Sequence, residues 1–148
     1  MLASIRNLRE ITTLCLTGES LPPDLSKWLG ATLHDFLAQR APSLDDAMGL
    51  KYPRGGVPWW IEEAIVKRDR VLREMGAACF DGQSRSAKAA TIHTLSTRYA
   101  ATAWLRDRDA EDMPAHYRDT PREYLWRAFK SGATMPLSER HLRTILMP

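Results

Sequence analysis

Apolar residues recur at helical spacing along most of this chain, and no stretch sustains the alternation of apolar and polar residues that a half-buried strand requires. The segment DLSKWLGATLHDFLAQ shows the pattern most fully, because its apolar residues follow the i, i+3, i+4 rule of one helix face. That face consists of Leu25, Trp28, Leu29, Leu33, Phe36 and Leu37. Pro22 and Pro23 suit a first helical turn, where a missing N–H costs little. The pattern predicts an all-α fold without a sheet.

Five further segments carry the signals of helix starts and ends. SLDDAMGL predicts a short helix with Ser43 as N-cap and Gly49 near its end. Two long helices are expected over 59–79 and 84–108. TPREYLWRAFKSG combines Thr120 as N-cap with Gly132 as terminator, and Ser138 is expected to cap a last short helix. Together they predict an orthogonal or bundle-like array of five to six helices.

The length of 148 residues is typical of one domain. The composition, 44% hydrophobic and 26% charged, is that of a globular protein rather than a disordered chain. We therefore expect residues 1–148 to form a single helical domain. In it, 59–79 and 84–108 run antiparallel, and residues 118–148 form a C-terminal helical hairpin.

Two segments have features of nucleic-acid binding. The formal net charge is +3, and residues 118–148 carry six Lys or Arg against three Asp or Glu. In VLREMGAACFDGQSRSAKAATIHTL two helices flank a glycine-containing turn, as in a helix-turn-helix, and the second helix opens with small hydroxyls and cations. The contacts there would be Ser84, Arg85, Ser86 and Lys88. The alternative is an ordinary helical hairpin, because this turn is longer than the three or four residues typical of the motif.

The second segment is the C-terminal helix pair YLWRAFKSGATMPLSERHLRTIL. Its polar sides carry Arg127, Lys130, Arg140, His141 and Arg143. The alternative is a capping hairpin with solvated arginines. A third basic run, KRDRVLR, is interpreted as a solvated stripe, because charge pairs at i, i+4 such as Arg70 and Glu74 are typical of exposed helix faces.

An aromatic corner, KYPRGGVPWW, precedes the first long helix and is expected to be a loop that leads into it. Its candidate partner-binding residues are Lys51, Tyr52, Arg54, Trp59 and Trp60. Tryptophan, tyrosine and arginine are the favoured anchors of protein interfaces. The alternative is that the tryptophans only fasten the loop onto the helix around Trp28 and Phe36.

No chemical motif points to a catalytic residue, a metal site or a cofactor. The glycine pair at 55 and 56 lacks the spacing of a phosphate-binding loop, the four histidines have no metal-binding spacing, and no serine lies in a nucleophile elbow. Cys15 and Cys79 share no motif and are expected to be buried free thiols in a reducing compartment. Arg6, Arg9 and Glu10 interrupt any apolar leader, so we expect a cytoplasmic protein without a membrane partner.

The sequence alone does not identify a function. The leading hypothesis is a small non-enzymatic helical protein that binds duplex DNA, as a regulator, through Ser84–Lys88 or the C-terminal arginines. Its rival is a protein-interaction module, or a homodimer, that uses the aromatic corner. An enzyme of unrecognised type is the third alternative, and it would need distant polar side chains to converge in a pocket.

Overall fold

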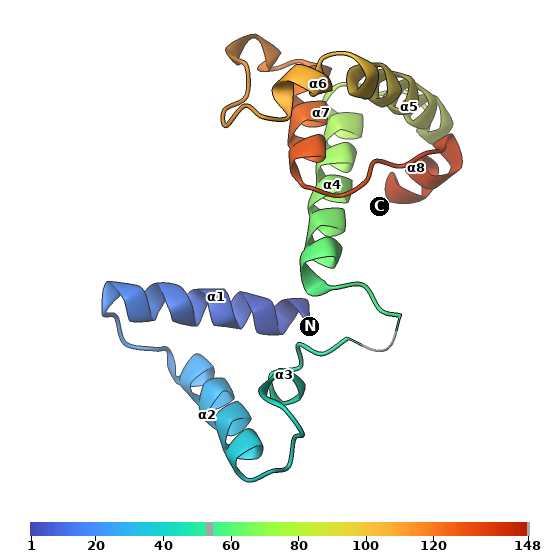
Figure 1. The fold of residues 1–148 in the computed structure, drawn as a ribbon. Coiled ribbons are helices and arrows are strands. Elements are labelled where there is room, and N and C mark those ends of the chain that lie inside the picture. The colour runs from blue at the N-terminus through green and yellow to red at the C-terminus, as the bar shows by residue number, and fades with distance from the viewer. Residues whose placement is uncertain (53–54, 148) are drawn as a thin grey trace. The chain divides into compact units, whose positions relative to one another are not determined.

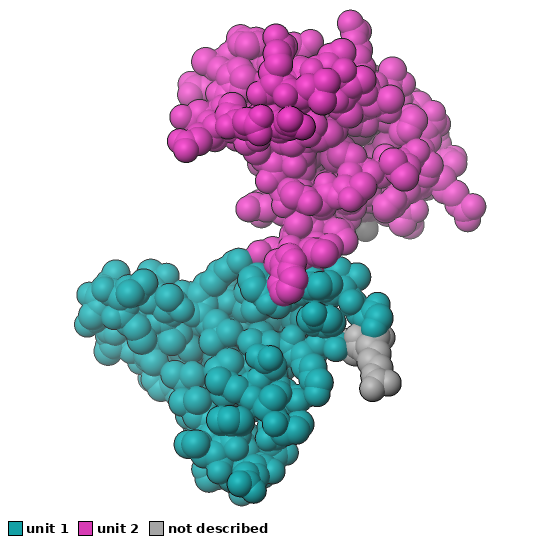
Figure 2. Space-filling view, in the orientation of Figure 1, with its two compact units in different colours: residues 1–59 teal, residues 60–148 magenta. Residues whose placement is uncertain are grey.

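The computed structural model describes residues 1–52 and 55–147, within which the chain forms eight α-helices and one short 3-10 helix (Figure 1). No strand occurs in these ranges, and the predicted all-α class is confirmed. The helices outnumber the expected five to six because an N-terminal helix was not predicted and the second long helix is interrupted. Two compact units divide the chain, Met1–Trp59 and Trp60–Pro148 (Figure 2). That residues 1–148 act as a single domain stays a prediction.

The first unit contains α1 (Leu2–Thr17), α2 (Pro23–Leu37) and α3 (Leu44–Ala47). α2 begins with proline at its first position, and the Ser43 hydroxyl caps α3 by accepting a hydrogen bond from the Asp46 N–H at 3.2 Å, both as predicted. Gly18 ends α1 with φ 75°, a left-handed conformation that glycine adopts without strain. The buried apolar residues of this unit are Ile5, Ile11 and Leu25.

Both cysteines are free thiols, but they differ in burial. Cys15 is exposed, so the expectation that it would be buried is wrong. The last turn of α1 lies at the surface of its unit, where Leu16 is also 83% exposed. Cys79 is half-buried after the end of α4, and its burial, followed by the charge of Glu123, raises the pKa of its thiol.

The second unit is built on α4 (Trp59–Ala78), whose first residue belongs to the first unit, and α5 (Arg85–Ala101). α6 (Trp104–Asp107), η1 (Ala115–Tyr117), α7 (Pro121–Lys130) and α8 (Glu139–Ile145) complete it. α5 packs against α6, α7 and α8. The buried core consists of Val71, Leu72, Met75, Ala89, Ile92, Tyr99, Ala103, Tyr117, Leu125, Ala128, Leu142 and Ile145.

The helix expected over 84–108 is not continuous, and the structure corrects this prediction. α5 ends at Ala101, and Thr102 leaves the helical conformation with φ −125° and ψ −88° before α6 begins. In a straight helix, residues 99 and 107 would be about 12 Å apart along the axis. The interruption instead lets the Tyr99 hydroxyl donate to the Asp107 carboxylate at 2.7 Å. The break therefore costs about half a turn of helix and allows a buried polar contact.

Candidate functional site

Three basic side chains follow one side of α4. Lys67, Arg70 and Arg73 are all exposed, and residues three apart are neighbours on a helix surface. The rise from Lys67 to Arg73 is about 9 Å, which matches roughly three phosphates along one strand of a duplex. These three side chains line two hollows in the surface of the second unit, and each hollow is also lined by cations from a second helix.

The first hollow, which we call the α7-side hollow, has a volume of about 220 Å³. It is lined by Lys67, Arg70, Val71, Trp126, Arg127, Lys130 and Ser131. Lys130 is held in place there, because its ammonium donates to the carbonyl oxygens of Arg108, at 2.8 Å, and Ala110. The same ammonium lies 5.4 Å from the Trp126 ring centroid, within the range of a cation–π contact. The hollow thus has two cations from α4 and two from α7.

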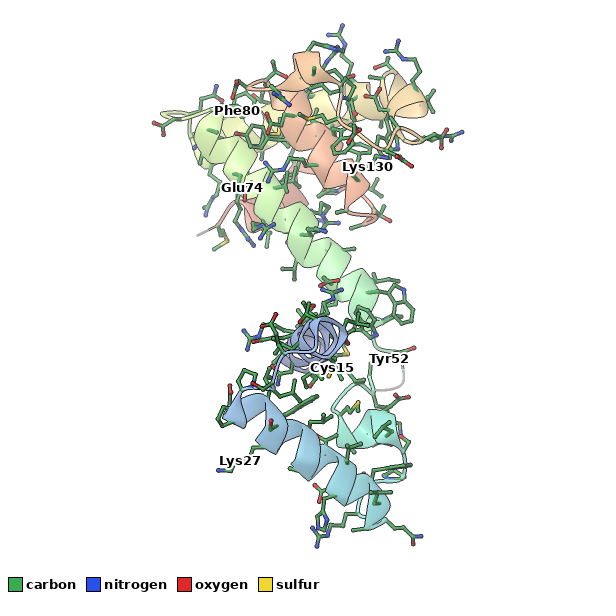
Figure 3. All side chains as sticks on the ribbon, turned by 90° about the vertical axis from the view of Figure 1, so that its left-hand side faces the viewer. Cys15, Lys27, Tyr52, Glu74, Phe80 and Lys130 are labelled. Atoms are coloured by element: carbon green, nitrogen blue, oxygen red, sulfur yellow. The ribbon has the colours of Figure 1, made fainter. Side chains whose placement is uncertain are left out.

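One acidic side chain lies beside these cations. Glu74 accepts a hydrogen bond from Arg127 at 2.8 Å and is 3.6 Å from the Arg70 guanidinium. Glu74 and Lys130 are labelled in Figure 3, on α4 and at the end of α7. Because all three side chains of this contact are at least a third exposed, the two ion pairs are weak and an incoming anion can compete for the arginines. Glu74 offsets part of the positive charge without lining the hollow.

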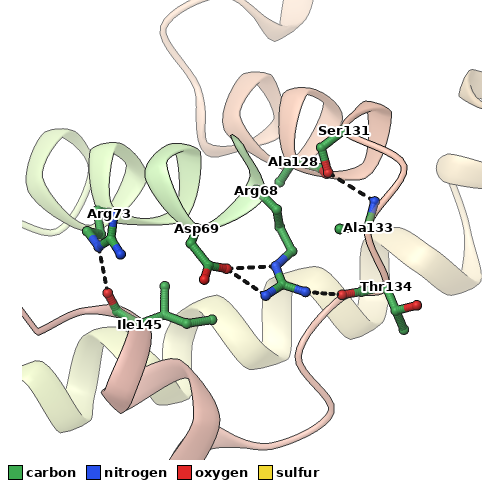
Figure 4. Close-up of polar contacts among 8 residues, drawn as sticks. All are labelled: Arg68, Asp69, Arg73, Ala128, Ser131, Ala133, Thr134 and Ile145. Atoms are coloured by element: carbon green, nitrogen blue, oxygen red, sulfur yellow. Dashed lines mark hydrogen bonds and ion pairs between the residues drawn. The ribbon is translucent and has the colours of Figure 1, made fainter. Parts of the chain in front are cut away.

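The second hollow, the α5-side hollow, has a volume of about 270 Å³. It is lined by Arg73, Gly76, Ala77, Gln83, Arg85, Lys88, Leu146 and Met147. The Arg73 guanidinium donates to the Ile145 carbonyl at 2.8 Å, which joins α4 to the end of α8 (Figure 4). At Gly76 an added Cβ would lie 3.1 Å from the Leu146 side chain and 3.8 Å from that of Lys88. The glycine therefore allows the end of α8 and the stem of Lys88 to approach α4 closely.

Four of the eight predicted nucleic-acid-binding residues lie in these hollows. Arg85 and Lys88 line the α5-side hollow, and Arg127 and Lys130 line the α7-side hollow. The other four do not line either one: Ser84, Ser86, Arg140 and Arg143. Ser84 is the N-cap of α5, and its hydroxyl accepts a hydrogen bond from the Ala87 N–H at 3.2 Å. Ser86, Arg140 and Arg143 are exposed, as is His141.

Sequence reasoning missed Lys67, Arg70 and Arg73 as members of a site. The run KRDRVLR was interpreted as a solvated stripe. Lys67, Arg70 and Arg73 are exposed in agreement with that interpretation, but Arg68 in the same run is buried. The sequence does not show that Arg127 and Lys130 lie beside Lys67 and Arg70, because they are about sixty residues further along the chain. The three-residue spacing of the cations was the available signal. We call the seven cations that line the two hollows the basic face: Lys67, Arg70, Arg73, Arg85, Lys88, Arg127 and Lys130.

The residues of the aromatic corner fall into both units. Lys51, Tyr52 and Trp59 belong to the first unit, Trp60 belongs to the second, and Arg54 lies outside the described residues. Tyr52 is 40% exposed and Trp60 is 53% exposed. The Lys51 ammonium donates to the Asp46 carboxylate at 3.0 Å and, together with the Ser43 hydroxyl, lowers the pKa of that carboxyl.

Trp59 lies against α1. Its ring lies 5.8 Å from the Arg9 guanidinium. It also lines a cavity of about 440 Å³ with Ile5, Leu8, Arg9, Thr12 and Thr13 of α1. Trp59 therefore contacts a helix that was not predicted from the sequence, and the expected packing of the tryptophans around Trp28 and Phe36 stays a prediction.

Two further findings concern the residues that the structure describes. Within these residues, no three His, Cys, Asp or Glu side chains are grouped so that they could hold a metal ion. Among the helices of residues 1–52 and 55–147, none combines the length and apolarity needed to cross a lipid bilayer.

The chain was compared with known proteins at the levels of family, sequence and structure. No protein-family model, no curated protein and no solved structure matches it.

Proposed function

We propose that this protein binds duplex DNA through the phosphate backbone, using the basic face of its second unit. The observation that carries the proposal is the composition of the two hollows. Seven cations from α4, α5 and α7 line them, and among the described lining residues there is no Asp or Glu. Phosphate contacts by Lys and Arg supply most of the affinity of sequence-independent DNA binding.

The geometry supports contact with several phosphates at once. Lys67, Arg70 and Arg73 extend along α4, while Arg127 and Lys130 on α7 and Arg85 and Lys88 on α5 bracket them. The carbonyls of Arg108 and Ala110 and the ring of Trp126 hold Lys130 in position before any ligand arrives. A cation that is already ordered loses less side-chain entropy on binding, so Lys130 is a favourable contact.

The start of α5 contributes phosphate contacts rather than base recognition in this proposal. A recognition helix presents a row of hydrogen-bonding side chains to the base edges. The exposed residues along α5 are instead mostly small, and beyond Lys88 Arg98 is the only exposed cation on the helix within the described chain. We therefore propose DNA binding with little sequence preference. Of the segment Ser84–Lys88, only Arg85 and Lys88 contact DNA in this proposal, and they contact phosphates.

The test is a titration of labelled mixed-sequence duplex DNA at several salt concentrations, read by fluorescence anisotropy. We expect saturable binding that weakens steeply with salt. The triple variant Lys67→Gln, Arg70→Gln, Arg73→Gln removes three phosphate contacts, so the slope of log K against log salt should become shallower by about 2 to 3. Affinity at low salt should fall by at least about tenfold, because three contacts are lost together.

The matched control removes the same charge elsewhere. Arg98, Arg106 and Arg118 are exposed and line neither hollow, so Arg98→Gln, Arg106→Gln, Arg118→Gln should leave the slope close to that of the unchanged protein. Equal losses in the two triple variants would show that only net charge matters and would refute the basic face as the site. No binding at low salt, together with a solution mass above one chain, would favour the protein-interaction alternative.

A further inference from the structure

A large cavity in the second unit is distinct from the basic face. It lies between the second half of α5 and the segment that joins α7 to α8, and its volume is about 910 Å³. Its walls come from α5, α6, the end of α7 and residues 132–137. Cavities that hold small molecules have volumes of about 300 to 1,000 Å³, so this one is large enough for a drug-sized ligand.

The wall formed by residues 132–137 is held by three side chains. Arg68 is only 4% exposed, pairs with Asp69 and donates a hydrogen bond to the Thr134 carbonyl (Figure 4). The Ser131 hydroxyl accepts a bond from the Ala133 N–H at 3.2 Å, also drawn in Figure 4. The His93 ring nitrogen Nε2 lies 3.3 Å from the Leu137 carbonyl. Anchoring from α4, α5 and α7 forms the cavity before any ligand binds, which lowers the entropy cost of binding.

The chemistry of the lining restricts the ligand. No Lys, Arg, Asp or Glu is found among its described residues, although such residues make up 26% of the chain. Trp104 and Phe129 form an aromatic end, with ring centroids 5.1 Å apart, and Ala100, Ala101 and Gly132 leave room between the walls. Without a charged partner an ionic ligand would lose hydration and gain no ion pair, so anions and cations are disfavoured.

A few polar groups remain for orientation. Since the Leu137 carbonyl can only accept, His93 Nε2 is the donor in that contact. The hydroxyls of Thr97 and Thr134 are donors and acceptors on the same lining. This combination of aromatic and aliphatic walls with a small number of polar groups is typical of sites for small organic molecules.

We infer that this cavity binds a neutral, largely apolar small molecule that carries an aromatic ring and one or two hydrogen-bonding groups. The ring packs against Trp104 and Phe129, and the polar groups meet Thr97, Thr134 or His93. The inference does not depend on DNA binding, because the cavity and the basic face share no lining residue.

The probe for the test is Nile red, a neutral aromatic dye whose emission shifts to the blue in an apolar site. We expect saturable binding of one dye per chain. Ala100→Phe places a phenyl ring inside the cavity and should weaken binding by about tenfold or more, equivalent to about 1.4 kcal/mol. Ala90→Phe is the matched control, because Ala90 is also a half-buried alanine of α5 but does not line the cavity.

A second variant covers the case in which Ala100→Phe fails to fold. Thr97 lines the cavity and is exposed, so Thr97→Trp fills the space without disturbing the core and should also weaken dye binding. Amide chemical-shift changes should concentrate in residues 93–104 and 129–137. Unsaturable binding, or equal affinity in the Thr97→Trp and Ala90→Phe proteins, would overturn the inference. So would shifts confined to other exposed apolar residues such as Leu16 and Leu37, which are 83% and 77% exposed.

Discussion

At the scale of single residues, Asp107 is a buried carboxylate of the second unit that needs hydrogen-bond partners. Its side chain is 7% exposed, and a buried carboxylate is costly unless hydrogen bonds replace its hydration. The hydroxyls of Tyr99 and Tyr117 both donate to its Oδ2 atom, at 2.7 and 2.8 Å. Burial first, and the bond to Asp107 second, raise the pKa of both phenols above the usual value. Three polar side chains in an apolar core thus satisfy one another's hydrogen-bonding groups.

This contact predicts a loss of stability at alkaline pH. In the unfolded chain the two phenols ionise near their ordinary pKa of 10.0, whereas in the folded protein they keep their protons to higher pH. Above about pH 10 the unfolded state therefore binds fewer protons than the folded state, and the free energy of unfolding falls as pH rises. Below that pH the contribution is fully present. Urea unfolding measured from about pH 8 to about pH 11 should show the decline.

Two phenylalanine variants separate this contact from general alkaline effects. Tyr117→Phe removes one of the two phenols, so the free energy of unfolding of this variant should decline less steeply above pH 10. At neutral pH the variant should be less stable than the unchanged protein, because one hydrogen bond to Asp107 is lost. Tyr52→Phe is the control, because Tyr52 is 40% exposed and belongs to the first unit. Parallel pH curves for Tyr117→Phe and the unchanged protein would contradict the prediction.

At the same scale, the sequence identified part of the candidate site and missed the rest for a physical reason. Arg85, Lys88, Arg127 and Lys130 were named because each lies in a locally basic segment. Arg68 was read with its neighbours as a solvated cation, yet it is buried, because its guanidinium meets the Thr134 carbonyl 66 residues away. Local spacing predicts which helix face a residue shares, but it does not predict which other segment covers that face.

At the scale of elements, helix starts were predicted better than helix interiors. Ser43 and Ser138 each accept a backbone hydrogen bond at the start of α3 and α8, as their predicted capping positions require, and Ser84 does so at the start of α5. α1 was not predicted, and its threonines explain part of the difficulty, since β-branched residues are weak helix formers. In the structure the hydroxyls of Thr12, Thr13 and Thr17 donate to carbonyls one turn back.

Arg68, one of the three side chains that hold residues 132–137, also belongs to a buried ion pair within α4, and this predicts a large cost for removing it. Arg68 and Asp69 are 2.6 Å apart, with side chains 5% and 18% exposed. Arg68→Met removes the cation, leaves Asp69 without it and frees the Thr134 carbonyl. We expect a loss of about 2 to 4 kcal/mol in the free energy of unfolding, measured by urea titration, somewhat less than for a fully buried pair because Asp69 retains some contact with water.

Arg70→Met is the matched control on the same helix. Its ion pair with Glu74 is 3.6 Å long and the arginine is 63% exposed, so the loss should be at most about 0.5 kcal/mol. The double variant Arg68→Met, Asp69→Asn should recover part of the stability, because the uncompensated carboxylate is removed. If Arg68→Met and Arg70→Met cost the same, Arg68 does not anchor the segment that forms the wall of the large cavity.

At the scale of the whole molecule, the two units differ in how much apolar structure they bury. The cluster that runs from Val71 to Ile145 is contributed wholly by the second unit, whereas the buried apolar residues of the first are Ile5, Ile11 and Leu25. A loop KYPRGGVP before α4 was predicted, but the division of the chain between Trp59 and Trp60 was not. Length and composition predicted one domain, but neither of them shows where along the chain contacts between residues become few.

The division predicts that the second unit folds alone. A fragment that begins at Gly56 keeps Pro58 and all of α4, and it retains every member of the buried cluster. It should unfold in one cooperative transition in urea and bind DNA with the salt dependence of the full chain, because the basic face also lies wholly within it. Residues 1–55 should show no cooperative transition, since three buried apolar side chains cannot offset the conformational entropy of that length of chain. A fragment 56–148 that stayed unfolded would mean that its core needs the first unit, and the single-domain interpretation would then be the better one.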